Sequence, residues 1–277
     1  KVTIIHRASI YQHIFSQVMD HTKNRFKLLK SANFFLIIVL LTIIFFNFFD
    51  IILFKASRDL NSIFYWFFNS IVNSIANILD PLNFGILLIS IFFLTSRLSN
   101  IIKEPNKKRL ILEKIECSEL ELKESIIYYK LIISHCILSI IMTGVACHLL
   151  KYILGVSRPK YFFLYNFERI DNFNLEHKIN ALPSGHTQAS FTLAILFYLY
   201  SNRYLILVFL LASLIALSRI FMSMHFPSDL ILGAYLGAIF PIILYINIYK
   251  RKFIEIDVKK IIKIKTFCKF LWYKIYV

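Results

Sequence analysis

Long apolar segments constrain the fold of this chain more than any other feature. Of its 277 residues, 58% are hydrophobic, against about 45–50% in an average soluble domain. Phe alone occurs 28 times, whereas Gly and Pro occur six times each. A soluble fold of this length could not hold so much apolar surface without exposing large patches. The composition therefore predicts an integral membrane protein.

Six segments are apolar enough to form membrane-spanning helices, which need about 20 such residues. They are Asn33–Phe54, Pro81–Ser96, Leu131–Leu154, Gly185–Ser201, Tyr204–Met222 and Ser228–Tyr249. The second and fourth are short and would need flanking residues to cross a bilayer. We therefore expect an all-α, polytopic membrane protein with six transmembrane helices. Its core would cover residues 33–249, between an N-terminal segment 1–32 and a basic tail 250–277.

Residues 60–79 carry an amphipathic helical pattern of their own. The apolar face of this helix would be formed by Phe64, Phe67, Phe68, Ile71, Ile75 and Ile78. Asn69, Asn73 and Asn77 would share another face. We expect an added helix that lies in the outer membrane–water interface. The alternative is that the segment extends the second span.

Lysine and arginine gather in three parts of the chain: 1–32, the connection 97–130 and the tail 250–277. Because cytoplasmic connections carry an excess of these residues, we expect both termini to be cytoplasmic. The connections before the fourth and sixth spans then lie on the outer face. The net charge of +16 does not indicate nucleic acid, because the cations adjoin apolar segments and form no stripe with stacking aromatic residues. Anionic membrane lipids are the expected partners.

Three short motifs lie at the predicted outer edges of the spans. They are Lys151-x6-Arg158-Pro159, Pro183-Ser184-Gly185-His186 and Ser218-Arg219-x5-His225-x3-Asp229. Three cations can hold three phosphate oxygens, and a Ser-Gly loop can add a hydroxyl and a backbone N–H. Two histidines can serve as nucleophile and general acid. The set therefore predicts phosphate-ester chemistry at one face of a membrane.

Each motif residue also has a simpler structural explanation. Lys151 and Arg158 could be helix-end residues that reach to water, although Lys and Arg are disfavoured on the outer side. Ser184 could cap the fourth span, where free N–H groups also form an anion site. His225 could be a histidine at the membrane interface that has no role in catalysis. Asp229 argues against this, because it can hold one imidazole nitrogen and present the other to substrate.

Other polar or small residues of the spans are interpreted as structural. His148 lies one turn before Lys151, and we expect a neighbouring carbonyl to satisfy it. The Gly233-x3-Gly237 pair predicts close packing between helices. The four cysteines form no CxxC pair and no metal-ligand spacing.

The three motifs resemble the signature of the type-2 phosphatidic acid phosphatase superfamily. All eleven specified positions match, in the same order and with the same internal spacings, between residues 151 and 229. Residues 1–127 carry no part of this signature. Soluble vanadium-dependent haloperoxidases share the same set of residues, but six apolar spans argue against that class.

The resemblance implies a role for each motif residue. His225 is expected to be the nucleophile that forms a phosphohistidine, with Asp229 orienting it. His186 is expected to protonate the leaving alcohol and then to activate water. The phosphoryl oxygens are expected to be held by Lys151, Arg158, Arg219, the Ser184 hydroxyl and the Gly185 N–H. No metal and no other cofactor is expected, because the cationic side chains supply the electrostatic stabilisation.

The sequence therefore predicts a lipid phosphatase that acts on a phosphate monoester or diphosphate at the outer face of the membrane. Candidate substrates are undecaprenyl diphosphate, phosphatidic acid, phosphatidylglycerol phosphate and lipid A. A bacterial inner membrane, with the site facing the periplasm or exterior, is the expected location. A lipid phosphotransferase using the same intermediate is the nearest alternative, and a catalytically silent membrane scaffold is another. The oligomeric state is left open.

Overall fold

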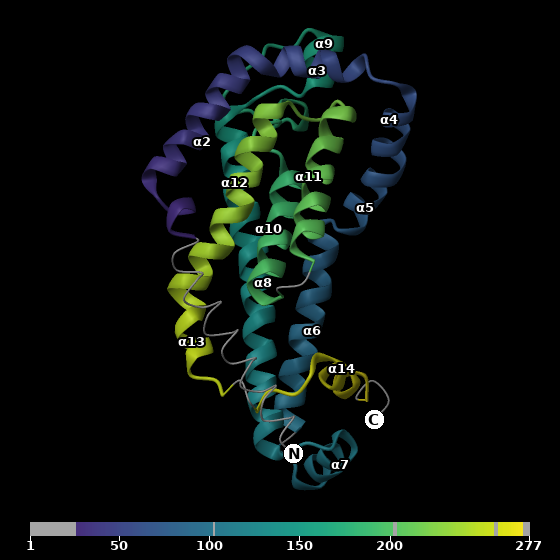
Figure 1. Ribbon diagram of the computed structural model, residues 1–277, viewed down its shortest axis with the longest axis vertical. Coiled ribbons are helices and arrows are strands. Elements are labelled where there is room, and N and C mark those ends of the chain that lie inside the picture. The colour runs from purple at the N-terminus through teal and green to yellow at the C-terminus, as the bar shows by residue number, and fades with distance from the viewer. Residues whose placement is uncertain (1–25, 102, 202–203, 258–259, 274–277) are drawn as a thin grey trace. The chain divides into compact units, whose positions relative to one another are not determined.

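The computed structural model describes residues 26–101, 103–201, 204–257 and 260–273, and these residues form helices joined by loops, without a β-strand (Figure 1). A single isolated bridge pairs Val156 with Ile170. The prediction of an all-α protein is confirmed. Most of the predicted N-terminal segment 1–32 lies outside the described residues.

The chain folds as two compact units. One, called the motif unit below, consists of residues 28–85 and 138–243, and it contains all three sequence motifs. The second unit contains residues 86–137 and 244–277. Two long helices, α6 (Pro81–Ile101) and α8 (Glu119–Leu154), have residues in both units.

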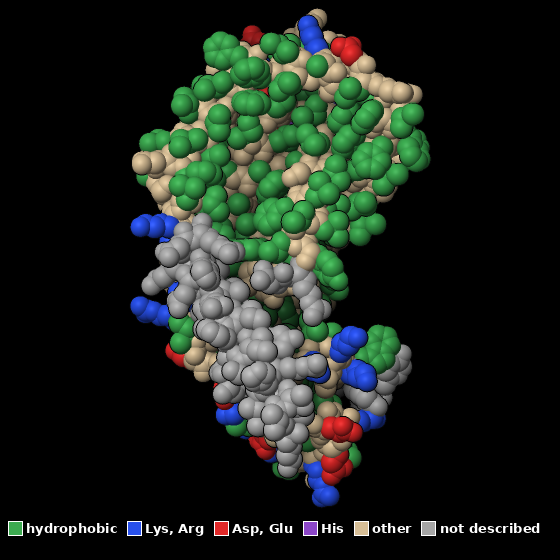
Figure 2. Space-filling model, viewed as in Figure 1, with side chains coloured by type: hydrophobic (Ala, Val, Ile, Leu, Met, Phe, Trp, Pro, Cys, Tyr) green, Lys and Arg blue, Asp and Glu red, His purple; other side chains and the backbone are tan. Residues whose placement is uncertain are grey.

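The helices of the motif unit alternate with short π-helical and 3₁₀ turns. In chain order they are α2 (Ala32–Ile44), η1 (Phe45–Phe49), α3 (Asp50–Arg58), α4 (Ser62–Trp66), η2 (Phe67–Val72), α5 (Asn73–Ile78), the last part of α8 (Glu119–Leu154), α9 (Pro159–Tyr165), η3 (His177–Ile179), α10 (Gly185–Tyr200), α11 (Leu205–Phe221) and α12 (Pro227–Leu244). Figure 2 shows hydrophobic side chains covering most of the visible face over α2 and α4. Such a surface suits lipid rather than water.

The second unit contains most of α6 (Pro81–Ile101), α7 (Pro105–Ile115), the first part of α8, η4 (Tyr245–Tyr249), α13 (Lys250–Ile254) and α14 (Ile264–Tyr273). Its core joins α14 to α6 and α8: Phe267 and Phe270 are buried against Leu98, Leu122 and Ile126. Part of the basic tail is therefore packed into this unit.

Four helical stretches of the described chain are long and apolar enough to cross a membrane: Ala32–Arg58, Ser62–Ile101, Glu119–Leu154 and Pro227–Ile254. They contain the first, second, third and sixth predicted spans. The fourth and fifth predicted spans are also helices, α10 with 16 residues and α11 with 17. At 1.5 Å per residue these are about 25 Å long, somewhat less than a hydrocarbon core. The chain is a membrane protein, while the number of crossings stays a prediction.

The helix predicted for residues 60–79 forms as α4, η2 and α5, and it packs lengthwise against α11 (Figure 1). Phe68, Val72 and Ala76 are buried against Ile215 and Phe221. Together with α6 the segment forms one long apolar stretch, Ser62–Ile101, as in the alternative in which it extends the second span. Its position in the outer interface stays a prediction.

Close packing of α12 on α10 brings the second and third motifs together. A Cβ atom added to Gly237 would lie 2.3 Å from the Gln188 oxygen, and one added to Gly233 would lie 2.8 Å from the Ser184 oxygen. The two helices therefore meet at backbone distance, as the Gly233-x3-Gly237 pattern predicted. One turn before Gly233, the Asp229 carbonyl accepts a hydrogen bond of 3.0 Å from the Ser184 N–H.

Helix α3 lies across the ends of α11 and α12 that carry the third motif (Figure 1). Arg58 donates hydrogen bonds to the last carbonyls of α11, those of Ile220 and Phe221. The Ile220 carbonyl also accepts from the Ser223 N–H at 3.0 Å, and a cation complements the helix dipole at this end. Phe54 packs on Phe226, so α3 is attached to both helices.

Candidate active site

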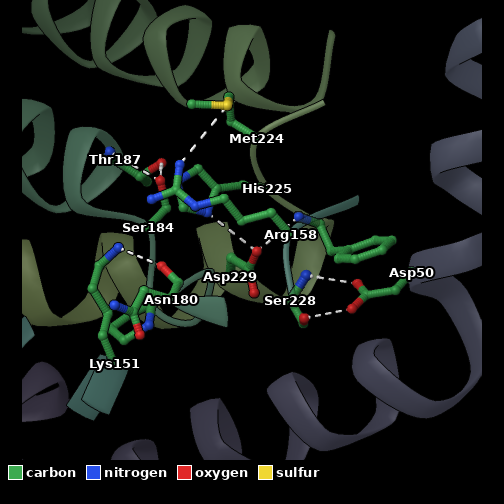
Figure 3. A network of polar contacts seen from close by, with 12 residues as sticks. Asp50, Lys151, Arg158, Asn180, Ser184, Thr187, Met224, His225, Ser228 and Asp229 are labelled. Carbon is green, nitrogen blue, oxygen red and sulfur yellow. Dashed lines mark hydrogen bonds and ion pairs between the residues drawn. The ribbon is translucent and has the colours of Figure 1, made fainter. Parts of the chain in front are cut away.

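A cavity of about 660 Å³ lies within the motif unit, and side chains from all three motifs line its polar end. Six of the eight predicted site residues are among them: Lys151, Arg158, Gly185, His186, Arg219 and His225. Asp229 and Ser184 are fully buried behind this wall. Figure 3 shows Lys151, Arg158, Ser184, His225 and Asp229 converging. Residues spread over 79 positions of the sequence thus meet at one place, from Lys151 to Asp229.

His225 lies in the turn that joins α11 to α12, and Asp229 lies in the first turn of α12. The Nδ1 atom of His225 lies 3.2 Å from Oδ2 of Asp229, and the Phe226 N–H donates to the same oxygen at 2.8 Å. Because the carboxylate can only accept, Nδ1 carries the proton and Nε2 keeps a lone pair. The pKa of His225 lies well below its ordinary value, first because the ring is buried and then because the Lys151 and Arg158 cations are near. The ring is therefore held neutral, the form a nucleophile needs.

Lys151 lies in the last turn of α8, and Arg158 is the N-cap residue of α9. Both line the cavity. Lys151 Nζ donates to the Asn180 carbonyl at 2.8 Å. Arg158 Nη2 lies 2.9 Å from His177 Nε2. Since the guanidinium is a donor only, Nε2 of His177 must accept. The pKa of His177 is lowered, mainly by the Arg158 charge and then by burial, which agrees with a neutral ring.

Arg219 enters from the last turn of α11. Its Nε and Nη2 atoms each donate to Ser218 Oγ at 3.0 Å, and Nη2 also donates to Asn73 Oδ1 at 2.7 Å. Asn73 comes from α5, outside all three motifs. The guanidinium is thereby fixed by contacts from two different helices.

Three buried cations face the cavity without a carboxylate partner. Lys151, Arg158 and Arg219 are each 5% exposed or less. Within the described part of the chain, none of the three forms an ion pair with Asp or Glu. Buried charges are normally paired, because an unpaired one is costly. The arrangement is therefore built for an anion that the protein does not itself supply.

Ser184 is the N-cap of α10. Its Oγ accepts from the Thr187 N–H at 3.5 Å and from the Thr187 hydroxyl at 3.0 Å. The structure thus assigns the hydroxyl a capping contact, and its predicted contact with phosphate stays a prediction. The first N–H groups of α10 at Gly185 and His186 remain at the cavity wall, where they suit an anion.

His186 is half-buried and lines the cavity. Among the residues that the structure describes, none forms a hydrogen bond with its ring. The imidazole is therefore free to meet a substrate atom, as a general acid must be.

The sequence reasoning missed four residues that support the site. Asn73 and His177 hold Arg219 and Arg158, as described above. Asp50 is fully buried, accepts hydrogen bonds from Ser228, and pairs with Arg169. A signal for Asp50 existed, because it is the one charge inside the first predicted span. Arg169 and His177 lie in a loop without periodicity, where no sequence signal separates them from their neighbours.

From the cations the cavity continues along α8 as an apolar groove. This part is lined by Ile141, Gly144, Val145 and His148 of α8 and by Leu82 of α6. A Cβ atom added to Gly144 would meet nothing within 4 Å, so the groove is open there. His148, interpreted from sequence as a structural residue, therefore lines the cavity. An apolar chain attached to a bound phosphate could lie in this groove.

No three His, Cys, Asp or Glu side chains gather in a metal-binding arrangement within the described residues. The cavity lining contains three cations and four histidines but one carboxylate, that of Asp80. Metal independence of the reaction stays a prediction.

Comparison with known proteins identifies relatives of the region that contains the motifs. Two proteins named lipid A 1-phosphatase, from Rhizobium johnstonii and Rhizobium etli, are 27% and 26% identical over 121 residues. That region is 44% of this chain and 50% and 52% of theirs. The bacitracin transport permease protein BcrC of Bacillus licheniformis is 30% identical over 118 residues, 42% of this chain and 57% of that protein. This chain thus spans about half the length of these curated relatives.

No solved structure matches the chain. The family model of the PAP2 superfamily matches residues 133–253, and all three motifs lie inside this range. Residues 133–253 therefore match the PAP2 superfamily, in agreement with the resemblance carried by the motifs.

Proposed function

We propose that the protein is an integral membrane lipid phosphatase that cleaves a phosphate monoester or diphosphate through a phosphohistidine on His225. One observation carries this proposal: three buried cations without carboxylate partners share a cavity with two histidines. Phosphoryl transfer depends mainly on positioning and on stabilising negative charge, and this set offers both.

In the first step, Lys151, Arg158 and Arg219 hold the phosphoryl oxygens. The Nε2 lone pair of His225 attacks phosphorus as the bond to the ester oxygen breaks. His186 donates its proton to that oxygen, so the lipid leaves as an alcohol or a monophosphate. Asp229 accepts from Nδ1–H and stabilises the positive charge that develops on the ring.

In the second step, water attacks the phosphohistidine. His186, now neutral, takes a proton from this water as the bond between phosphorus and Nε2 breaks. Inorganic phosphate leaves, and both histidines return to their starting states. The three cations face the same negative charge in both steps, which is the role that a metal ion has in other phosphatases.

The substrate is proposed to be a lipid. The apolar groove along α8 joins the phosphate end of the cavity, so one molecule could place its phosphate at the cations and a tail beside Gly144. The names of two relatives, lipid A 1-phosphatase, favour a lipid A-type phosphate. Undecaprenyl diphosphate, phosphatidic acid and phosphatidylglycerol phosphate complete the panel to be tested.

The test is phosphate release by the purified protein in detergent from this panel of lipid phosphates. We expect hydrolysis of at least one lipid, unaffected by EDTA. Arg158→Gln should lose most of this activity, whereas Lys160→Gln, two residues on and exposed, should keep it. An inactive wild type would contradict the proposed function, and a complete loss in EDTA that Mg²⁺ restores would indicate a metal enzyme.

We also propose that the site faces the periplasm or exterior of a bacterial inner membrane, with segments 1–32 and 250–277 in the cytoplasm. The distribution of Lys and Arg supports this orientation. In a cysteine-free background, Asn172→Cys should react with an impermeant thiol reagent applied to intact cells. Asn106→Cys should react only after the membrane is broken. The reverse labelling would place the site in the cytoplasm.

A further inference from the structure

We propose that Asp50 and Arg169 are positioning residues that hold the His225–Asp229 turn in its reactive geometry. The inference rests on the proposed function. Both residues lie outside the three motifs, and Asp50 also lies outside residues 133–253, which match the PAP2 superfamily.

Asp50 fixes the start of α12. It is the first residue of α3 and its side chain is fully buried. Oδ1 accepts from the Ser228 N–H at 2.9 Å, and Oδ2 accepts from the Ser228 hydroxyl at 2.6 Å (Figure 3). A carboxylate at a helix N-terminus satisfies a free N–H group and is favoured by the helix dipole. Asp50 therefore caps α12 from a segment 178 residues away.

Arg169 offsets the negative charge of the buried Asp50 carboxylate. It also contacts Phe226, on the other side of Pro227. Its guanidinium forms an ion pair with Asp50. The guanidinium carbon also lies 3.7 Å from the centre of the Phe226 ring and 4.4 Å from that of Phe46. A cation over an aromatic face is attractive, and more so away from water. The pair thus contacts Phe226, which follows His225, and Ser228, which precedes Asp229.

The hydrogen bond from His225 to Asp229 depends on the three residues between them. The Phe226 N–H is used by Asp229, Pro227 has no N–H, and the Ser228 N–H is used by Asp50. The contacts of Asp50 and Arg169 therefore supply external anchors on both sides of Pro227. The turn is also held by the Ser184 N–H, which donates to the Asp229 carbonyl, and by Phe54, which packs on Phe226.

A merely structural role for the pair would be to attach α3 to the bundle. That attachment has other contacts, because Arg58 donates to the Ile220 and Phe221 carbonyls and Phe54 stacks on Phe163. Loss of a positioning role should lower kcat, whereas loss of a structural role should lower stability and phosphate binding together. The two roles can therefore be separated by a kcat-against-binding measurement.

The experiment compares Asp50→Asn with wild type on p-nitrophenyl phosphate, and measures inhibition by inorganic phosphate. Asn keeps the shape of Asp50 and an acceptor for Ser228, but it loses the ion pair with Arg169. We expect kcat to fall about a hundredfold, the effect of a small misplacement of a reacting group. The inhibition constant of phosphate should stay unchanged, because the three cations are intact. Asp59→Asn, an exposed carboxylate next to α3, is the matched control and should behave as wild type.

Two milder variants decide the question if Asp50→Asn does not fold, since it leaves Arg169 without its partner. Ser228→Ala removes one of the two hydrogen bonds to Asp50, and Arg169→Lys keeps the charge without the planar group over Phe226. Each should lower kcat about tenfold, the equivalent of one hydrogen bond, at unchanged phosphate inhibition.

Wild-type kcat in Asp50→Asn, or in both milder variants, would overturn the inference. A parallel loss of kcat, phosphate inhibition and thermal stability would also overturn it, in favour of a structural role. Failure of the proposed function is a different result, because wild type itself would then hydrolyse neither the lipid panel nor p-nitrophenyl phosphate.

Discussion

The motif unit contains buried charged side chains, whereas the ion pairs of the second unit are exposed. In the motif unit, Asp50, Lys151 and Arg219 are each 5% exposed or less and contact groups from distant segments. In the second unit, the ion pair of Arg109 with Glu113 has side chains 82% and 61% exposed, four residues apart on one helix. Burying an ion costs several kcal/mol, whereas an exposed pair contributes about 0–1 kcal/mol. The difference indicates that the motif unit carries charges for function, and that substitutions should have very different effects in the two units.

His225→Ala should have the largest effect of any single substitution. We expect turnover to fall at least about 10⁴-fold, because the group that forms the covalent bond is removed. Thermal unfolding and phosphate inhibition should change little, since Lys151, Arg158 and Arg219 remain. Substantial turnover in a folded His225→Ala protein would leave the cations as a binding site and remove the proposed mechanism.

Removal of one buried cation should have the second-largest effect on activity. Arg219→Gln should lower kcat/KM by about 10²–10³, the usual cost of losing one charge-stabilising donor. Arg109→Gln in the second unit is the matched control, and its kcat/KM should equal that of wild type. Similar losses in both variants would break the contrast between buried and exposed charges.

The contact of Asn73 with Arg219 should have a smaller effect. Asn73→Ala removes an acceptor at 2.7 Å and should lower kcat/KM about tenfold, the value of one hydrogen bond to a charged group. Asn69→Ala, one turn earlier on the same helix and exposed, should be neutral. Equal effects of the two substitutions would mean that the helix acts through packing and not through this contact.

The pH dependence of kcat/KM should depend on the cations around His225, because they lower the pKa of its ring. The ring must be neutral to attack, and its pKa lies below the ordinary value of 6.5, so the acid limb of the profile should fall below pH 6.5. Lys151→Gln removes one charge that lowers this pKa, and its acid limb should move to higher pH. An acid limb that stays in place would show that Lys151 does not act on His225.

Loss of an exposed ion pair in the second unit should have the smallest effect on stability and activity. Lys108 and Lys123 both pair with Glu119, and all three side chains are at least 30% exposed. Glu119→Gln should leave thermal unfolding and kcat/KM nearly unchanged, because exposed ion pairs contribute little to stability. Loss of activity in this variant would assign the second unit a part in catalysis.

The helices and the convergence of the motifs could be predicted from sequence, for different physical reasons. Apolar runs of sufficient length must be helices in a membrane, because every backbone polar group has to be satisfied within the segment. The motifs lie at the ends of such runs, so their meeting at one face follows from alternating helix directions. Gly185 begins α10 at the predicted start of the fourth span, and α12 begins at Pro227, one residue before the predicted start of the sixth.

Contacts that depend on side-chain direction could not be predicted. Periodicity placed Asn69, Asn73 and Asn77 on one face, but only packing against α11 turns Asn73 toward Arg219. The partner of Asp50 is 178 residues away, and no local pattern encodes it. His148 belongs to the cavity because Gly144, one turn before it, leaves the adjoining groove open.

Trapping the covalent intermediate tests the central claim most directly. Protein incubated with ³²P-labelled substrate would be quenched in alkali, where phosphohistidine survives, and its peptides mapped. We expect label on the peptide that contains His225. Label on another residue, or turnover without any labelled protein at quench times shorter than one turnover, would contradict the account.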